Sequence, residues 1–593
     1  MSNHLAMKQA LADIEHNAGQ NDAVRESGHC IVLAGPGSGK SKTLIIAMAR
    51  ALLEDVIDPR GVACITYNNE CAIELEVRLA KLGIESNHRT FIGTVHSFAL
   101  TQVITPYARC IAGLLPDDFR VATRDEMRAA VEAAYCAVFG NAGDPHKRWR
   151  LAEQKRRRDV DRSLPAWRGR NSDLADFIEA YEAILRRNGL IDFDDMPIIA
   201  FRMIKEHLWI RNALRARYPV LFVDEYQDLG HALHELVWLL CIHGGVRLFA
   251  VADIDQSIYG FTGANPELLN ELLERVDVKT IRLRFNYRSG SKIIHASLGA
   301  LGEERDYRSV DGTSDGELTF WPVQGDHDLQ AQHIAEAILP SLLDRDFKPE
   351  QIAILYRAAW LGDKVAEALE RIEIAFVRTD SKALVRRSSR LARFIEACAG
   401  WVTGGWRSAD PPYGWLLGQA LSIVYGGRAS EDEKQALSRQ LIAFLRGGID
   451  VGETTHAWLN RFLHELVKPW QAIARNVHQE WEVCLEMIAR TDPAKALDIP
   501  LNFLSGRIEG AGRVTLSTLH SAKGREFDAV IMFGINNSDI PNRRDYESDL
   551  ALREARRLFY VGVTRPRQEL CFVFRKHHHS PWVAELYHRC QRG

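Results

Sequence analysis

Short apolar runs that alternate with helical patterns organise most of the chain. Seven of these runs are rich in branched and aromatic side chains and have the length of strands: 29–34, 61–66, 218–223, 246–251, 351–356, 513–518 and 527–534. Helical patterns lie between them, as at 41–55. Buried strands separated by helices are typical of a parallel sheet covered on both faces. We therefore predict an α/β protein, and the restart of the pattern near residue 351 indicates two such cores.

Two mainly helical stretches interrupt the predicted cores. A chain of 593 residues suits about four units of roughly 150 residues each. The insertions are predicted at 96–192 and 381–507, which leaves 1–95 and 193–282 for the first core and 283–380 and 508–593 for the second.

Composition narrows the class of protein. Hydrophobic residues make up 46% and charged residues 26%, which is ordinary for a soluble globular chain. The longest apolar stretches, such as 236–242, are too short to span a membrane, and the N-terminus has no signal-peptide core. The cysteines show no C-x-x-C spacing, so we expect no zinc or iron–sulfur site and a reducing, cytoplasmic location. The net charge of −3 means that any nucleic-acid surface must be local.

A glycine-rich turn after the first strand carries the strongest chemical signal. Residues 34–41 read AGPGSGKS, follow a predicted strand and open a predicted helix. In such a phosphate loop, backbone N–H groups turn toward the phosphates, the lysine reaches the β- and γ-phosphates, and the serine hydroxyl ligates Mg²⁺. The alternative is a turn that binds nothing, which this context disfavours. We predict ATP and Mg²⁺ as cofactors, held by Ala34, Gly35, Pro36, Gly37, Ser38, Gly39, Lys40, Ser41 and Lys42.

A second strand ends in two carboxylates. The segment 221–228 reads LFVDEYQD, and an acid at the carboxyl end of a strand in such a sheet lies beside the phosphate loop. Asp224 can hold Mg²⁺, and Glu225 can orient or deprotonate the attacking water. The alternative is a solvated acidic turn. The phosphate loop upstream favours the functional interpretation over this alternative.

An ordered set of motifs resembles superfamily 1A DNA helicases of the UvrD/Rep/PcrA type. The matching strings are NAGQNDAV (17–24), GTVHSF (93–98), VDEYQD (223–228), ADIDQSIYGFTGA (252–264), NYRS (286–289), TLHSAKGREF (518–527) and RLFYVGVTR (557–565). The resemblance implies two RecA-like cores, each with an insertion subdomain. It also implies a motor that hydrolyses ATP, moves 3′→5′ on single-stranded DNA and unwinds duplex.

The resemblance assigns nucleotide contacts residue by residue. Gln20 should read the adenine edge, Tyr287 should stack on the adenine, and Glu526 should contact the ribose. The γ-phosphate should be approached by Gln256, Arg288 and Arg565, with both arginines supplied by the second core. Surface ion pairs are the alternative for the arginines, and core packing is the alternative for the tyrosine. Lys42 stands where the family usually has arginine; because lysine cannot stack as a plane, we expect looser base selectivity.

A track for single-stranded DNA needs rings for the bases and cations for the phosphates. The candidate contacts are Tyr67, His96, Tyr259, Phe261, Tyr356, Arg357 and His520. For any one ring at a strand end, packing in the core is the competing explanation. Two positions depart from the family: Phe261 replaces tryptophan, and Thr262 replaces arginine.

The first insertion contains a strongly basic segment. Residues 147–170 include ten Lys or Arg against three Asp or Glu, with Trp149 and Trp167 among them. Such a patch is typical of contact with a nucleic-acid backbone. A solvated helix face is the alternative.

Three functions fit these motifs. The first is a DNA helicase or translocase, with a role in DNA repair and with single-stranded DNA, duplex DNA and a repair protein as partners. The second is a DNA-stimulated ATPase that unwinds poorly and senses DNA for a partner nuclease, as in the Gabija-like pairs of antiviral defence. The third is a DNA-binding scaffold without catalysis, which the intact Lys40, Asp224, Glu225 and Arg565 disfavour.

Overall fold

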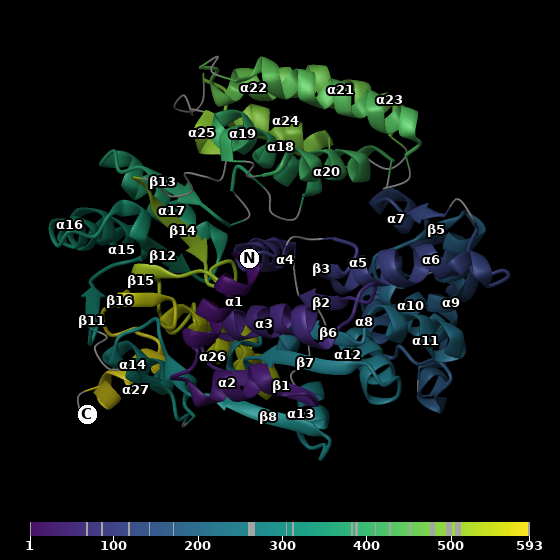
Figure 1. The fold of residues 1–593 in the computed structure, drawn as a ribbon. Helices are drawn as coiled ribbons and strands as arrows, with labels where there is room; N and C mark the ends of the chain where they lie inside the picture. The colour runs from purple at the N-terminus through teal and green to yellow at the C-terminus, as the bar shows by residue number, and fades with distance from the viewer. Residues whose placement is uncertain are drawn as a thin grey trace. The chain divides into compact units, whose positions relative to one another are not determined.

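The structure is a computed structural model, drawn as a ribbon in Figure 1. The chain forms two compact units. The first comprises Met1–Glu317, Arg543–Thr564 and Glu585–Gly593, and the second comprises Leu318–Asn542 and Arg565–Ala584. The structure describes residues 2–590 except 67–68, 85–86, 117–118, 142, 170, 259–266, 304, 311–313, 381–382, 386–388, 409–410, 426–428, 450–451, 475–480, 494–500 and 505–511.

A six-stranded sheet forms the centre of the first unit. Its strand order is β3-β2-β6-β7-β1-β8, and the neighbouring strands pair in parallel. The strands are β1 (His29–Ala34), β2 (Val62–Thr66), β3 (Thr90–Thr94), β6 (Val220–Val223), β7 (Arg247–Ala252) and β8 (Val278–Leu283). The strand order places the ends of β1, β6 and β7 close to one another, which brings three of the predicted motifs to one edge of the sheet.

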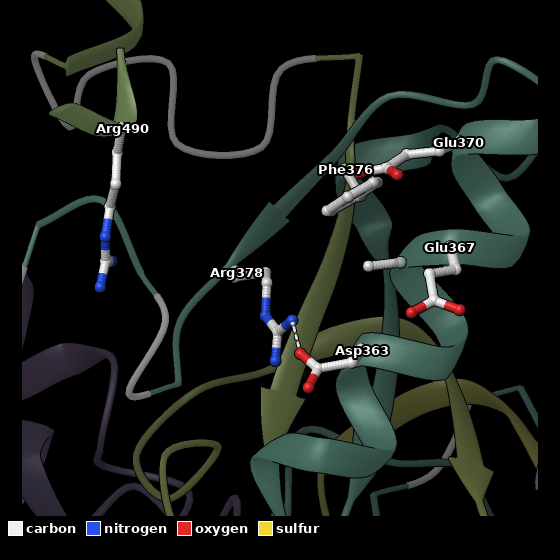
Figure 2. A pocket seen from close by; sticks show the side chains of 7 residues that line it. Asp363, Glu367, Glu370, Phe376, Arg378 and Arg490 are labelled. Atoms are coloured by element: carbon white, nitrogen blue, oxygen red, sulfur yellow. Dashed lines mark hydrogen bonds and ion pairs between the residues drawn. The ribbon is translucent and has the colours of Figure 1, made fainter. Parts of the chain in front are cut away.

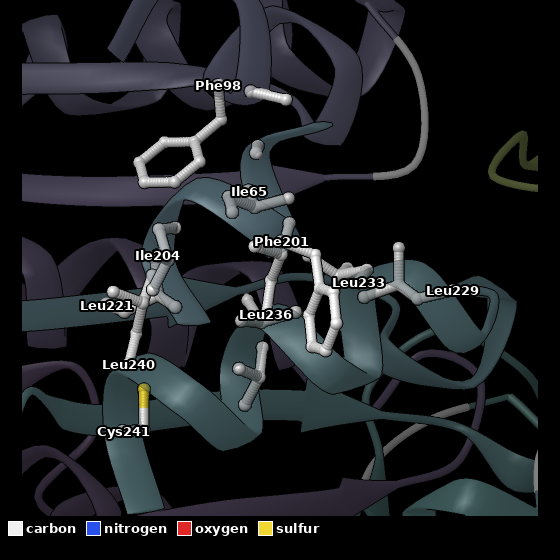
Figure 3. Close-up of a cluster of buried hydrophobic side chains, with 14 of the residues drawn as sticks. Ile65, Phe98, Phe201, Ile204, Leu221, Leu229, Leu233, Leu236, Leu240 and Cys241 are labelled. Carbon is white, nitrogen blue, oxygen red and sulfur yellow. The ribbon is translucent and has the colours of Figure 1, made fainter. Parts of the chain in front are cut away.

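Two apolar clusters cover the two faces of this sheet. Successive side chains of a strand point to opposite faces, and accordingly Cys30 and Val32 lie in one cluster while Ile31 and Leu33 lie in the other. Helix α3 (Lys40–Arg50) contributes to the first cluster. Helices α10 (Asp195–Glu206) and α12 (His231–Val237) contribute to the second, which Figure 3 shows around Phe201 and Leu236. Burial on both faces explains why these strands read as continuous apolar runs.

The first insertion has its own apolar core. Its main helices are α7 (Arg124–Phe139), α8 (Pro145–Arg158) and α9 (Ser172–Arg187). Helix α7 starts with a capping box, in which Thr123 and Glu126 each satisfy a backbone N–H of the other. The helices enclose aromatic side chains that include Trp167, which is 3% exposed.

The second unit repeats the architecture. Its sheet has the order β11-β16-β15-β12-β14-β13. The strands are β11 (Glu317–Val323), β12 (Ile352–Tyr356), β13 (Phe376–Arg378), β14 (Val514–Thr518), β15 (Phe527–Phe533) and β16 (Pro566–Arg575). A helical bundle interrupts this sheet in sequence and packs around Trp458 and Trp470. Its longer helices, green in Figure 1, are α18 (Arg390–Gly400), α20 (Tyr413–Tyr425), α21 (Glu431–Gly447), α22 (Thr455–Phe462) and α24 (Trp481–Arg490).

The predicted α/β class with two parallel sheets is confirmed, and each of the seven predicted strands is present. The predicted helix 41–55 is α3 followed by a π-helical turn, Ala51–Asp55. The division of the cores at residue 282 stays a prediction; the first compact unit continues to Glu317. Among the described residues, no helix has both the length and the apolar character needed to cross a membrane.

Candidate functional site

The phosphate loop joins β1 to α3. Gly37 and Gly39 have φ angles of 68° and 86°, in the left-handed region that glycine adopts without steric cost. Gly39 is the N-cap residue of α3 and has no side chain with which to satisfy the first N–H groups of the helix. Uncapped N–H groups at a helix N-terminus form an anion site. The loop therefore fits the phosphates that its sequence predicts.

Lys40 lies in a buried ion pair. Its Nζ donates to Oδ2 of Asp253 at 2.9 Å and to the carbonyl oxygen of Ala34 at 3.3 Å. Burial alone would lower the pKa of Lys40, but Asp253 and Glu225 outweigh burial, and the pKa lies above its ordinary value. Lys40 is therefore charged at neutral pH, and its partner Asp253 is a site residue that the motifs did not single out.

Asp224 follows the last residue of β6 and is 4% exposed. Burial and the neighbouring Glu225 raise its pKa to about 7, although Lys40 opposes the shift. A divalent cation at such a carboxylate favours its charged form and offsets the free-energy cost of ionising it in a buried site. Asp224 and the half-buried Ser41 at the start of α3 are therefore a donor set that suits Mg²⁺.

Glu225 has an unusual backbone conformation. Its φ and ψ are both 49°, a left-handed conformation that non-glycine residues rarely adopt. Gln227 holds it in place: the Gln227 amide donates to the Glu225 carboxylate, and Oε1 of Gln227 accepts the N–H of Asp253 at 2.9 Å. Strain of this kind is concentrated at functional sites. The signal that could have revealed Gln227 is that it is the one amide side chain within the acidic motif 223–228.

Gln256 is connected directly to Lys40. It ends a short turn, Ile254–Gln256, and its Nε2 donates to Oδ2 of Asp253 at 2.5 Å. Lys40 donates to the same oxygen atom. A change in the contacts of the Lys40 ammonium therefore affects Gln256, because both groups donate to Oδ2 of Asp253.

The motif at 286–289 packs on the phosphate loop. The N–H of Tyr287 donates to the Gly37 carbonyl oxygen at 2.8 Å, and a Cβ placed on Gly37 would lie 2.6 Å from the Cβ of Arg288. The Tyr287 hydroxyl accepts from Asn17 at 2.8 Å, and half of the Tyr287 surface is exposed. The sequence assigned both residues to the second core, but in the structure they belong to the first compact unit.

The predicted adenine contacts lie around the same loop. Gln20 is buried, and its Nε2 donates to Oγ1 of Thr43 at 3.0 Å. A Cβ on Gly39 would lie 2.4 Å from this nitrogen, so Gln20 covers the end of the loop. Lys42 is exposed and pairs with Asp13 at 3.2 Å. The adenine role of Gln20 stays a prediction.

Two predicted nucleotide residues belong to the second unit. Arg565 is 1% exposed, and its Nη1 donates to the carbonyl oxygen of Arg525 at 3.3 Å. Glu526 accepts from Arg567 at 3.0 Å. Their approach to a nucleotide in the first unit stays a prediction.

Three of the predicted DNA contacts, Tyr67, Tyr259 and Phe261, lie outside the described residues. His96 is half-buried, and burial lowers its pKa. Its ring meets the ring of Phe193 edge to face, with centroids 5.9 Å apart. Phe193 is 58% exposed and was not predicted from the sequence. No sequence signal distinguishes this ring, because singly exposed apolar side chains are common on protein surfaces.

The structure contradicts the predicted contact between Tyr356 and DNA. The residue is 0% exposed, and its hydroxyl donates to Asp380 at 2.6 Å. The physical reason is that Tyr356 ends β12, which pairs with β14 on one side and β15 on the other. The neighbouring Arg357 and His520 are half-buried. Burial, Arg357 and Lys523 lower the pKa of His520 to about 4, so its ring is neutral at pH 7 and lies beside two cations.

Most cations of the basic segment 147–170 are paired with carboxylates, which its sequence did not predict. Arg148, Lys155, Arg156, Arg157, Arg158, Arg162 and Arg168 each form an ion pair with a carboxylate. The cationic groups of Lys155 and Arg162 each lie over the ring of the buried Trp167, and Trp149 packs on Tyr181. The acids that pair with Arg156, such as Asp192, are distant in sequence, so the local charge count could not include them.

Arg156 is expected to stabilise the insertion rather than to bind DNA. Its guanidinium is 1% exposed and contacts Glu182, Asp192 and Asp195 at 2.8, 2.7 and 2.5 Å. Replacing it with alanine removes the cation that pairs with the buried Asp192, while Arg162 and Arg186 still pair with Glu182 and Asp195. Breaking this buried pair should cost about 3–5 kcal/mol in the free energy of unfolding. The exposed Lys147 is the matched control, since its replacement should change stability by less than about 0.5 kcal/mol. Urea unfolding of the two variants measures the difference, and equal stabilities would refute this role.

A cavity of about 530 Å³ lies in the second unit (Figure 2). Its lining includes Asp363, Glu367 and Glu370 of helix α17 (Ala359–Arg371), together with Arg378 and Arg490. Arg378 pairs with Asp363 at 2.6 Å. These side chains belong to none of the predicted motifs, so we do not assign the cavity to the nucleotide site.

Two models of known protein families match the chain. The model of the UvrD/REP helicase N-terminal domain matches residues 16–277, and that of the UvrD-like helicase C-terminal domain matches residues 502–577. The first match includes the phosphate loop, Asp224 and Gln256, and the second includes Arg565. Together they span more than half of the 593 residues.

Individual proteins are similar over nearly the whole chain. The ATP-dependent DNA helicase Rep of Buchnera aphidicola is 25% identical over 94% of this chain and 94% of its own length. DNA helicase II of Haemophilus influenzae is 25% identical over 96% and 87% of the two chains. The ATP-dependent DNA helicase UvrD1 of Mycobacterium bovis is 28% identical over 94% and 82%. With both family models matched and similarity along nearly its full length, the chain belongs to the UvrD/Rep helicase family.

Proposed function

We propose that this protein is an ATP-dependent DNA helicase that moves 3′→5′ on single-stranded DNA and unwinds duplex. One observation carries the proposal: Lys40 and Gln256 donate to the same oxygen of Asp253. Around this atom lie the buried Asp224, which interacts electrostatically with Lys40, and the strained Glu225. A phosphate loop with a charged lysine, an acidic strand end and a phosphate-facing amide are the parts that phosphoryl transfer to water needs.

We assign a separate role in ATP hydrolysis to each residue of the site. Lys40 and the first N–H groups of α3 bind the terminal phosphates. Glu225 orients the attacking water and accepts its proton, and Gln256 donates to the transferring phosphoryl group. Ser41 and Asp224 would hold Mg²⁺, which would supply positive charge to neutralise the phosphates. Arg288 and Arg565 stabilise the charge that develops on the phosphoryl oxygens.

Asp253 couples the nucleotide to the rest of the molecule. A bound phosphate competes with Asp253 for the Lys40 ammonium, because both are anions. When Asp253 loses this partner, its carboxylate keeps the hydrogen bonds from Gln256 and from the N–H of Asp255. The turn Ile254–Gln256 then has a different set of contacts, and in the sequence it leads into Tyr259 and Phe261. ATP binding and hydrolysis thus alternate the position of the segment that precedes two predicted base contacts.

Each unit offers its own candidate contacts for single-stranded DNA. Phe193 offers a face to a base, since it is 58% exposed and held on one side by His96. In the second unit, Arg357 and Lys523 provide positive charge beside His520. Stacking on rings and attraction to the phosphates bind single strands without sequence preference.

A strand-displacement assay with matched tails tests the proposal. Duplexes with a 3′ tail, a 5′ tail or blunt ends are incubated with the protein and ATP, and both displaced strand and phosphate release are measured. We expect displacement from the 3′-tailed duplex alone, and phosphate release that depends on single-stranded DNA.

The other outcomes each contradict part of the proposal. Displacement from 5′ tails only would refute the polarity. DNA-stimulated phosphate release without displacement would replace the helicase with a DNA-sensing ATPase, and candidate nucleases would then be added to the same assay. DNA binding without phosphate release would leave only a scaffold.

A further inference from the structure

Asp255 is the centre of a polar cluster that the motifs do not explain. It is 4% exposed, and its carboxylate accepts two hydrogen bonds from Arg305, at 3.0 and 2.9 Å. A third hydrogen bond comes from the Tyr307 hydroxyl at 3.2 Å. The N–H of Asp255 donates to Oδ1 of Asp253 at 3.2 Å. The two aspartates are therefore linked, one bound by Lys40 and the other by Arg305 and Tyr307.

Tyr307 also covers the phosphate loop. A Cβ placed on Gly35 would lie 2.6 Å from Cζ and 2.8 Å from Cε1 of the Tyr307 ring. The ring can approach this closely only because residue 35 is glycine. Burial, then Asp253 and Asp255, raise the pKa of Tyr307, so the hydroxyl stays a donor at neutral pH. One side chain thus contacts the backbone of the phosphate loop with its ring and Asp255 with its hydroxyl.

A third cation connects this cluster to a distant motif. Arg557 lies close enough to Asp255 for the two charges to interact. It belongs to helix α26 (Asp549–Val563), which contacts the turn Ile254–Gln256 and ends two residues before Arg565 in the sequence. The turn that carries Gln256 therefore contacts the phosphate loop, Tyr307 and the helix that precedes Arg565.

We propose that Tyr307 is a positioning residue for ATP hydrolysis, which holds Gly35 of the phosphate loop and, with Arg305, fixes Asp255 so that Gln256 faces the transferring phosphoryl group. This inference rests on the proposed ATPase function. The Tyr307 hydroxyl acts on the turn Ile254–Gln256, and the Tyr307 ring acts on the phosphate loop. The two parts of the side chain therefore have separable effects.

Steady-state ATP hydrolysis with saturating single-stranded DNA separates the two effects. Tyr307→Phe keeps the ring and loses the hydrogen bond to a carboxylate, so kcat should fall about 10-fold while KM for ATP stays within about two-fold. Tyr307→Ala also exposes Gly35, and a less ordered loop should raise KM about 10-fold. A side chain with a purely structural role would not split kcat from KM in this way.

Two double variants test the contacts themselves. Asp255→Asn removes the acceptor charge, so Tyr307→Phe should have little further effect on kcat in that background. Gly35→Ala places a methyl group where the Tyr307 ring lies, so alone it should resemble Tyr307→Ala. Combined with Tyr307→Ala it should be no worse than either single change. Effects that multiply in both pairs would refute the contacts as functional links.

The control is Tyr546→Phe, which alters a 57% exposed tyrosine of the first unit and should match the wild type. Urea unfolding of each variant reports any loss of stability. An active wild type with unchanged kinetics in Tyr307→Phe and Tyr307→Ala would overturn this inference alone. A wild type that hydrolyses no ATP would overturn the proposed function, and this inference with it.

Discussion

Lys40→Ala is expected to reduce DNA-stimulated ATP hydrolysis by about 10²–10³-fold or more, the effect of removing one donor to developing charge. Lys40 is a charged group in a buried site, where its interaction with phosphate is far stronger than in water. The variant also leaves Asp253, which is 2% exposed, with its negative charge and without the ammonium. A bound nucleotide would then face uncompensated repulsion, so affinity for ATP should fall as well.

Phosphate release and equilibrium binding of a fluorescent ATP analogue measure the two effects of Lys40→Ala. Lys279→Ala is a suitable control, because Lys279 is exposed and pairs with Glu26 at 2.8 Å on the surface of the same unit. The control should keep wild-type turnover. Turnover above about a tenth of the wild-type rate in Lys40→Ala would show that the loop is not the catalytic site.

Arg565→Lys is expected to reduce turnover by about 10³–10⁵-fold, the contribution measured for arginine fingers in related chemistry. Lysine keeps the charge but loses the planar fork that contacts two phosphate oxygens at once. Because Arg565 does not belong to the phosphate loop, binding of ATP should change little while kcat falls. This separation of kcat from binding distinguishes a finger from a residue that only holds the nucleotide.

Stability is the main control for Arg565→Lys, since the arginine is 1% exposed. Thermal unfolding should show a folded protein with a cooperative transition. Arg575→Lys changes an exposed arginine at the other end of β16 and should leave turnover unchanged. A folded Arg565→Lys variant with turnover near that of the wild type would exclude Arg565 from the site.

Residues that are close in sequence were the ones that could be predicted. The phosphate loop, the acidic strand end and the turn around Gln256 each occupy a few consecutive positions at the end of a strand, so chain connectivity alone places them. The central strands could also be predicted from the sequence, because burial on both faces makes them continuously apolar. Strand β8 was missed because exposed residues such as Lys279 interrupt its buried positions, Val278, Ile281 and Leu283.

Residues whose role depends on distant partners could not be predicted. The burial of Tyr356 follows from the two strands that flank β12, and nothing in its own segment reports this. The ion pairs of Arg156 join positions 26 to 39 residues apart. Tyr307 contacts Gly35 and Asp255 only because the chain returns to the phosphate loop after β8. Local patterns therefore predict the chemistry, whereas the residues that support the site could be found only from the fold.

The paired charges of the first insertion have a consequence for the thermodynamics of DNA binding. Lysines and arginines drive association with DNA chiefly by displacing condensed cations from the phosphates, which makes affinity fall steeply with salt. Seven basic residues of segment 147–170 already have carboxylate partners, so they have little capacity left to displace such cations. The affinity of this protein for DNA should accordingly tolerate rising ionic strength better than the raw charge of that segment suggests, because stacking on rings does not depend on ion release.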